Sequence, residues 1–370
     1  MASLVALAGF AGAGIWLART PYPFAGEPIV VADIPPAEEL KTASIDKPEG
    51  EEASDPVLSA EETPVPTESE AIADTAEPAP AQLQQDTYRT EAAIFVSPRR
   101  ALKPAPIAAI MEVGTMGQLP RIGPGGKKAM DLYARTTPRG VVDSDMPKIA
   151  ILLGGMGLNP KLTKQAIADL PGDITFAFAP YGTDLQTQVD KARKDGHEVM
   201  LQLPMEPVGY PATNPGPRTL LSDAEAPANL EALLWHMSRF TGYTGVTNYM
   251  GGKFLAEAQS LRPVATELKS RGLLFLEDST VPLTVTAETA KSAGLPLRKS
   301  QIVIDADPNP ASIRAALDLL EGEARSNGFA IGTGSGLSIT IETVAEWSKQ
   351  LQERGILLVP VSAAYKARRT

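Results

Sequence analysis

The sequence predicts an α/β fold built on a parallel β-sheet from Lys148 onward. Short apolar runs of β-rich character recur along this region, and stretches with helical spacing separate most of them. Glycines follow several of the expected helices, as helix C-termini often require. Because seven or eight strand-and-helix repeats can be counted, a closed barrel is favoured over an open sheet.

The first expected strand, Ile149 to Leu153, ends at Gly154 and Gly155, with Gly157 close behind. A buried parallel strand passes to its crossover helix in this way, and the carboxyl ends of such strands are where α/β proteins place binding and chemistry. We therefore expect a site, or the remains of one, at this end. The other expected strands are 174–178, 198–203, 245–248, 273–276, 301–304, 329–331 and 356–359.

Helices are expected between these strands because apolar residues there recur at helical intervals. The clearest sets are Leu185, Val189 and Ala192; Leu230, Leu233, Leu234 and Met237; and Ile313, Ala316, Leu317 and Leu320. The expected C-terminal caps are Gly196, Gly272, Gly294 and Gly355.

The chain before this region has a different composition. Residues 2–18 carry no charge and Arg19 follows them, so residues 1–19 are predicted to be an uncleaved membrane anchor, with a cleaved signal peptide as the alternative. Residues 20–145 are rich in Pro, Ala, Glu, Thr and Ser and bury too little apolar surface to fold. They are predicted to be a disordered tether, and residues 146–366 the globular domain.

Composition excludes some functions. A net charge of -10 with no clustered basic surface argues against a nucleic-acid partner. With Cys 0, the chain has neither disulfides nor thiolate chemistry. His197 and His236 are the two histidines; the first is expected to hydrogen-bond structurally at a strand's start, and the second to lie on a helix surface or interface.

Polar residues at the strand ends are the candidates for chemistry. Glu206 and Asp278 follow different strands and are weak candidates for an acid and base pair, although capping or pairing with Arg is the more ordinary role. With Asp305 they could form an all-oxygen metal site, but no spacing motif supports one. Asp305 and Asp307 are more typical of a turn before a helix, and the GTGSG run at 332–336 is a nonspecific anion candidate.

Several segments together resemble the divergent polysaccharide deacetylase family. They are KIAILLGGMGLN at 148, LPGDITFAFAPYGTDL at 170, GHEVMLQLPMEP at 196, NPGPRTLL at 214, GVTNYMGGKF at 245, RGLLFLEDST at 271 and RGILLVPVSA at 354, which cover residues 147–364. The resemblance implies a distorted seven-stranded β/α barrel. It also implies an envelope protein, here anchored in the inner membrane with its domain in the periplasm.

The departures from that family decide the expected function. The resemblance implies an Asp-Asp pair where this chain has Gly154 and Gly155, and histidines where it has Gln202, Tyr249 and Thr333. Since these side chains cannot hold a metal-bound water, no metal or other cofactor is expected. We expect an inactive module that binds peptidoglycan, another glycan or an envelope protein. The expected groove residues are Tyr181, Gln202, Glu206, Asn248, Tyr249 and Asp278; the alternative is an active deacetylase or hydrolase rebuilt on Glu206 and Asp278.

Overall fold

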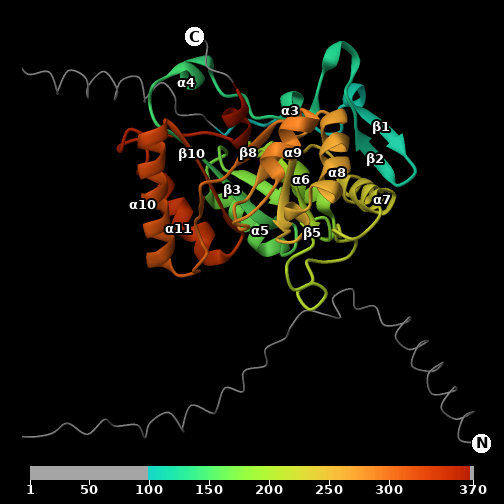
Figure 1. Ribbon diagram of the computed structural model, residues 1–370. Coiled ribbons are helices and arrows are strands. Elements are labelled where there is room, and N and C mark those ends of the chain that lie inside the picture. The colour runs from blue at the N-terminus through green and yellow to red at the C-terminus, as the bar shows by residue number, and fades with distance from the viewer. Residues whose placement is uncertain (1–98, 367–370) are drawn as a thin grey trace, which may run out of the picture. The chain divides into compact units, whose positions relative to one another are not determined.

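The computed structural model describes residues 99–366, and Figure 1 shows a sheet surrounded by helices. The strands are β1 (Met111–Gly114), β2 (Gly117–Pro120), β3 (Lys148–Met156), β4 (Thr175–Phe178), β5 (Val199–Met205), β6 (Gly245–Met250), β7 (Leu274–Glu277), β8 (Leu297–Lys299), β9 (Ile302–Val303), β10 (Phe329–Ser335) and β11 (Leu357–Leu358). The helices are α3 (Ala129–Leu132), α4 (Arg139–Asp143), α5 (Pro160–Asp169), α6 (Leu185–Lys194), α7 (Ala226–Met237), α8 (Ala258–Ser270), α9 (Thr286–Ala293), α10 (Pro310–Asn327) and α11 (Ser338–Ser348).

The main sheet is parallel and curled into a half-barrel, with strand order β8-β7-β6-β5-β4-β3-β10-β9. The short segment 297–303 pairs with β7 through β8 and with β10 through β9, so both edges of the sheet meet the same segment. All eight predicted strands are present with shifted ends, whereas β8 was not predicted. The predicted α/β fold with a parallel sheet is therefore confirmed, but the sheet curls into a half-barrel where a closed, seven-stranded barrel was predicted.

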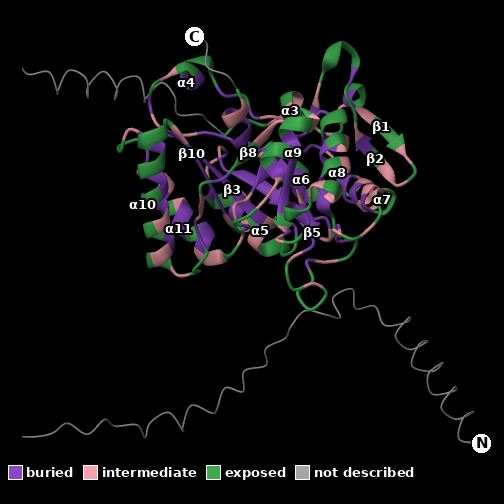
Figure 2. Cartoon of the chain, viewed as in Figure 1, coloured by how far each residue is buried: buried purple, intermediate pink, exposed green. Residues whose placement is uncertain are grey.

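Alternating residues of each strand enter two different hydrophobic clusters. In β3, Ile149, Ile151 and Leu153 pack in the larger cluster with the surrounding helices, while Ala150 and Leu152 fill the concave side of the sheet. The alternation arises because successive side chains of a β-strand point to opposite faces of the pleated sheet. Both sides are apolar, so the strands are buried throughout, as Figure 2 shows.

The first strand continues through the glycines at which it was expected to end. Gly154 still pairs with Ser335 of β10, and β3 ends at Met156. On the other edge the register with β4 shifts between Leu153 and Met156, and Gly155 has a φ of 74°. A β-bulge with a left-handed glycine accounts for both features.

The predicted disordered tether is wrong for residues 99–145, and residues 20–98 lie outside the described part. Residues 99–145 contain the β1–β2 hairpin, α3 and α4, and they bury Ile110, Leu119 and Tyr133 in the main core. Arg193 of α6 also enters this segment and donates hydrogen bonds to the carbonyl oxygens of Lys103 and Tyr133. The segment folds because the barrel supplies these partners, which its own composition does not reveal.

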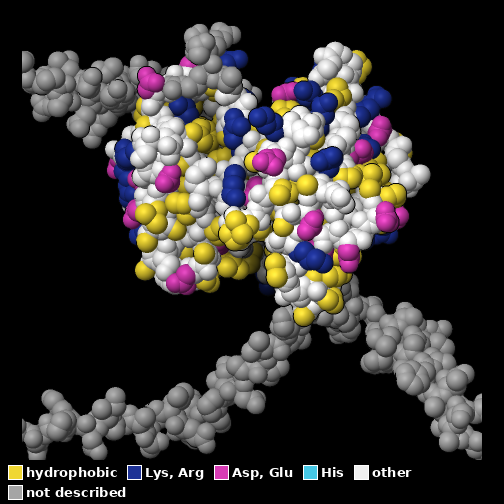
Figure 3. All heavy atoms as spheres, viewed as in Figure 1, with side chains coloured by type: hydrophobic (Ala, Val, Ile, Leu, Met, Phe, Trp, Pro, Cys, Tyr) yellow, Lys and Arg dark blue, Asp and Glu magenta, His cyan; other side chains and the backbone are white. Residues whose placement is uncertain are grey.

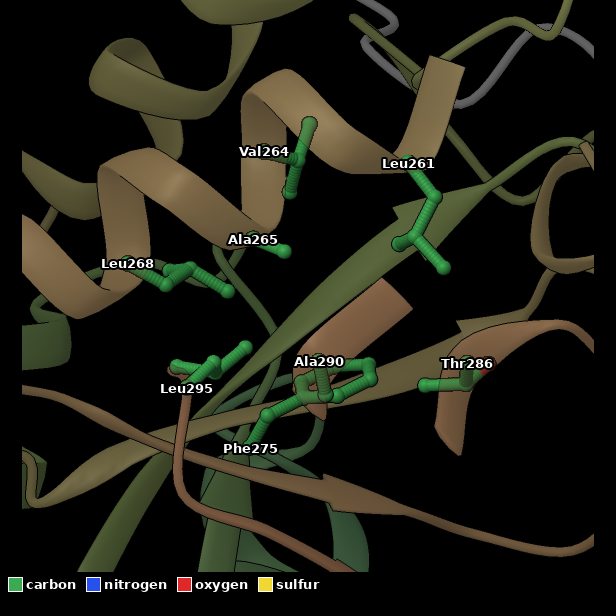
Figure 4. Close-up of a pocket in the computed structure, with 8 residues that line it drawn as sticks. All are labelled: Leu261, Val264, Ala265, Leu268, Phe275, Thr286, Ala290 and Leu295. Carbon is green, nitrogen blue, oxygen red and sulfur yellow. The ribbon is translucent and has the colours of Figure 1, made fainter. Parts of the chain in front are cut away.

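A small void lies between α8, α9 and β7 (Figure 4). Its volume is about 10 Å³, and its lining is apolar apart from Thr286, whose hydroxyl has no hydrogen-bond partner among the described residues. A water needs two or more polar partners in such a space, so this is a packing defect and not a ligand site.

Over residues 99–366, no helix combines the length and hydrophobicity needed to cross a bilayer. The predicted anchor, residues 1–19, lies outside the described residues.

Candidate functional site at the carboxyl ends of the strands

The strand alternation brings most of the substituted positions to one place. Leu152, Met200 and Ile331 lie on the concave side of the sheet, so the residues two further along each strand share that side. These are Gly154, Gln202 and Thr333. Asp278 comes directly after β7 and lies beside Thr333, whose hydroxyl donates to the Asp278 carbonyl oxygen at 2.9 Å. Tyr249 holds the same place on β6, two residues after Thr247. The sequence prediction that these positions meet at the carboxyl edge agrees with this arrangement.

The side chain of Gln202 occupies the space beside the two glycines. Its Oε1 accepts a hydrogen bond from the Gly155 N–H at 2.8 Å. Its Nε2 lies 2.7 Å from where a Cβ on Gly154 would lie. A side chain at residue 154 would therefore collide with the Gln202 amide. Gly154 and Gln202 are therefore complementary, because the amide of Gln202 occupies the space that a side chain at residue 154 would need.

Asp278 is the carboxylate that faces this region. Its Oδ1 accepts hydrogen bonds from Asn248 Nδ2 at 2.8 Å and from the Thr280 hydroxyl and N–H. Its Oδ2 receives none from the described residues. Burial raises the pKa of Asp278, although the bonds from Thr280 and Asn248 oppose the rise. The half-buried carboxylate is thus held in one orientation with one oxygen available.

Asn248 does not line a groove, contrary to the sequence prediction. It is completely buried, and its Oδ1 accepts from the Asp278 N–H at 2.9 Å. Since Asn248 and Thr247 alternate along β6, Asn248 points away from the concave side. Its role is to hold Asp278 in place.

Glu206 is likewise engaged inside the protein. Its Oε2 accepts from the N–H and hydroxyl of Ser222, each at 2.6 Å, and its Oε1 accepts from Lys253 Nζ at 2.7 Å. Burial opposes its ionisation, but the bonds from Lys253 and Ser222 outweigh this and lower its pKa. The carboxylate closes the base of the loop 207–221, and no described bond joins it to Asp278. No spacing pattern in the sequence points to Ser222 or Lys253 as partners of Glu206.

Tyr181 lies under that loop. Its hydroxyl is buried without a hydrogen-bond partner among the described residues, and burial raises its pKa. A Cβ on Gly216 would lie 2.6 Å from the Tyr181 ring, so the loop covers the ring closely. The loop therefore covers part of Tyr181, which is half-buried.

The two histidines are both buried, which corrects the prediction for His236. His236 Nε2 bonds to the Arg218 carbonyl oxygen at 2.8 Å, and its ring meets Tyr181 edge-on. His197 bonds to the Ile174 carbonyl oxygen at 2.9 Å and stacks on Phe176, which confirms its structural role. Burial lowers the pKa of each to about 4, so both are neutral at neutral pH.

Comparisons with known proteins agree with this architecture. A family model for divergent polysaccharide deacetylase matches residues 151–365. The chain belongs to the divergent polysaccharide deacetylase family. The crystal structure of an uncharacterized protein from Agrobacterium tumefaciens is 42% identical, with a TM-score of 0.65, and the match covers 67% of this chain and 99% of that one.

Two curated relatives are more distant. The uncharacterized protein YibQ of Escherichia coli is 26% identical over 54% of this chain, and the match spans 61% of YibQ. An uncharacterized protein of Haemophilus influenzae is 24% identical over 56% of this chain and 72% of its own length. The match to YibQ thus spans about three fifths of that relative.

The residues of this deacetylase-family chain do not fit the metal that the family's hydrolytic chemistry implies. Gly154 offers no side-chain ligand, and the space beside it holds the uncharged amide of Gln202. Thr333 donates its hydroxyl to the Asp278 carbonyl oxygen at 2.9 Å. Within residues 99–366, no three His, Asp or Glu side chains are grouped to bind a cation.

The remaining candidates have structural roles. Asp305, considered as a third metal ligand, accepts from the Ser335 N–H and the Thr340 hydroxyl and so fixes the start of α11. Of the GTGSG run, the Gly336 N–H bonds to the Gly154 carbonyl oxygen. Asn309 caps α10, as the predicted turn requires. None of these amides or carboxylates is placed to bind an anion or a cation.

Proposed function

We propose that this protein is a non-hydrolytic binding module for a ligand rich in hydroxyl and amide groups, a glycan such as peptidoglycan, at the carboxyl-end face. The observation that carries the proposal is the Gln202 amide packed against Gly154 and Gly155. It replaces a metal and its ligands with a neutral donor and acceptor. Such groups recognise hydroxyl and amide groups of a sugar without activating water.

Exposed apolar residues around this face support binding. Among the described residues, large exposed hydrophobic side chains occur at or just after the ends of five strands: Leu158, Val208, Tyr249, Leu283 and Leu337. In Figure 3 hydrophobic side chains gather along the lower edge of the molecule, where the loop after β5 projects in Figure 1. Apolar side chains exposed on several neighbouring loops are typical of an interaction site.

Tyr249 is the residue best placed to contact a sugar ring. Its side chain is 39% exposed and belongs to the concave series at the end of β6. An aromatic ring offers a flat face to the C–H groups of a sugar. We expect Tyr249, Gln202 and the free oxygen of Asp278 to make the principal contacts.

The proposed location is the cell envelope. The uncharged stretch 2–18 supports an anchor in the inner membrane, with residues 146–366 in the periplasm. An envelope protein is the alternative ligand for the same face.

Calorimetric titration of the domain with soluble peptidoglycan fragments tests the proposal. We expect Tyr249→Ala to weaken binding about tenfold, as loss of one aromatic contact of roughly 1.5 kcal/mol implies. Leu319→Ala, a change of an exposed apolar residue on α10, is the control and should bind normally. Unchanged binding in Tyr249→Ala would place the ligand elsewhere.

Asp278 supports a second function, a hydrolase rebuilt on one carboxyl group. Its raised pKa and unshared Oδ2 suit a general acid or base. The hydrolase would be established if the protein released acetate or sugar from peptidoglycan and Asp278→Asn abolished this release. Binding without release of either product supports the binding module. Tight uptake of one divalent metal would contradict it.

A further inference from the structure

A larger hollow lies at the opposite end of the sheet from the carboxyl-end face. Its volume is about 370 Å³. It is bordered by the end of α11 and the turn after it, by residues 356–360, by residues 136–141 and by the turn 169–173. None of the predicted groove residues borders it. This amino-end hollow is therefore independent of the proposed binding function.

One wall of the amino-end hollow is a strand with an unused edge. Leu357 and Leu358 of β11 pair with Lys148 and Ile149 of β3, and the part of the chain that is described supplies no strand for the other edge of β11. The stretch that contains β11 ends in Val359 and Pro360, which also border the hollow. An unpaired edge beside a partly apolar space accepts an extended segment as an added strand.

The described chain begins at the rim of the same hollow. Arg99 borders it, and its guanidinium donates to the carbonyl oxygens of Ala168 and Leu170, each at 2.7 Å. It also forms an ion pair with Asp195 at 2.7 Å. These carbonyl groups belong to the C-terminal end of α5, where a cation is favoured. The residues preceding Arg99 are thereby tethered to the hollow.

The sequence just before this tether is suited to such a strand. Ala92–Val96 reads AAIFV, an apolar run with a β-branched and aromatic character, between polar residues and Ser97-Pro98. Phe95 is four residues from Arg99, so an extended chain places it within about 14 Å of that residue. A short tether supplies an effective concentration of order millimolar, so weak pairing suffices to fill the site.

We propose that Ala92–Val96 of this same chain occupies the amino-end hollow as a strand added beside β11. The N-terminal region then leaves the domain at the amino ends of the strands. The carboxyl-end face stays open on the side away from it.

Thiol labelling of the full-length chain tests this. The protein has no cysteine, so Ser348→Cys, in the wall of the hollow, provides a single probe. Its rate of reaction with N-ethylmaleimide is compared in three backgrounds: the parent chain, Ile94→Asp with Phe95→Asp, and Leu83→Asp with Tyr88→Asp. The last pair is the matched control, because it changes charge equally in the same region outside the run.

We expect labelling to be about tenfold faster when Ile94 and Phe95 are replaced, and unchanged in the control, because the charges disfavour burial of the strand. Protection should also persist on about 100-fold dilution, since the contact is intramolecular. Equal rates in all three backgrounds would overturn the proposal. Protection lost on dilution would assign the hollow to a second copy, and protection lost in the control would assign it to another segment.

Discussion

The contact between Gly154 and Gln202 allows a quantitative test by a double-mutant cycle. In Gly154→Ala the new Cβ would lie 2.7 Å from Gln202 Nε2, so the amide must move and lose its 2.8 Å bond to the Gly155 N–H. That loss costs about 1 kcal/mol, and residual crowding adds on the order of 1 kcal/mol. Alanine at a strand position regains about 0.5–1 kcal/mol relative to glycine. The single variant should therefore be destabilised by about 1 kcal/mol.

In a Gln202→Ala background the bond is already absent and the space is open. Gly154→Ala should then stabilise the protein by about 0.5 kcal/mol, so the coupling energy is about 1–3 kcal/mol. The free energy of unfolding would be measured by urea denaturation, followed through the fluorescence of Trp347, which is buried in the core. A coupling energy within about 0.3 kcal/mol of zero would refute the steric reasoning.

Gly155→Ala is the matched control for this cycle. No atom lies within 4 Å of a Cβ there, but the φ of 74° disfavours any side chain. It should cost about 1–2 kcal/mol whether or not Gln202 is present. An Asp-Asp pair restored at residues 154 and 155 therefore meets two separate obstacles, one steric and one conformational.

Three further outcomes follow from the buried charged and titratable groups. The pKa of His197 and of His236 is held near 4, below the ordinary 6.5, so the unfolded chain binds more protons between these values. The free energy of unfolding should fall as pH drops through this window, by up to about 1.4 kcal/mol per pH unit for each histidine, and His236→Phe should reduce the slope in denaturation curves at several pH values. Glu206→Gln should destabilise the protein by about 1–3 kcal/mol at pH 7. The pKa of the Glu206 carboxyl is lowered in the folded protein, so the stabilisation that it contributes is present above its ordinary pKa and is lost in acid. An unchanged denaturation midpoint at pH 7 would show that the bonds of Glu206 to Ser222 and Lys253 contribute little to stability. Arg193→Met should leave the carbonyl oxygens to which Arg193 donates without a donor, and should lower the free energy of unfolding by about 2–3 kcal/mol. Trypsin should then cut residues 99–147 faster. Equal rates of cutting would show that this segment is held by its apolar contacts alone.

The sequence by itself determined the sheet and its helices, because each depends on a local pattern. The continuous apolar run of β3 indicates a strand that is buried on both sides, and the helical spacing of Leu185, Val189 and Ala192 indicates which side of α6 is buried. Such burial drives folding wherever the pattern occurs. The lack of a side chain at Gly154 and Gly155 was also visible in the sequence. Glycine supplies no side-chain ligand in any fold.

Only the tertiary structure decided which polar residues remain available to a ligand. Asn248 is used by Asp278, 30 residues away, and Glu206 by Lys253, 47 residues away, and neither interval carries a spacing signal. The same holds for residues 99–145, which fold around Arg193 from a later helix. Such contacts form only when folding brings together residues that are far apart in the sequence, so no short stretch of sequence predicts them.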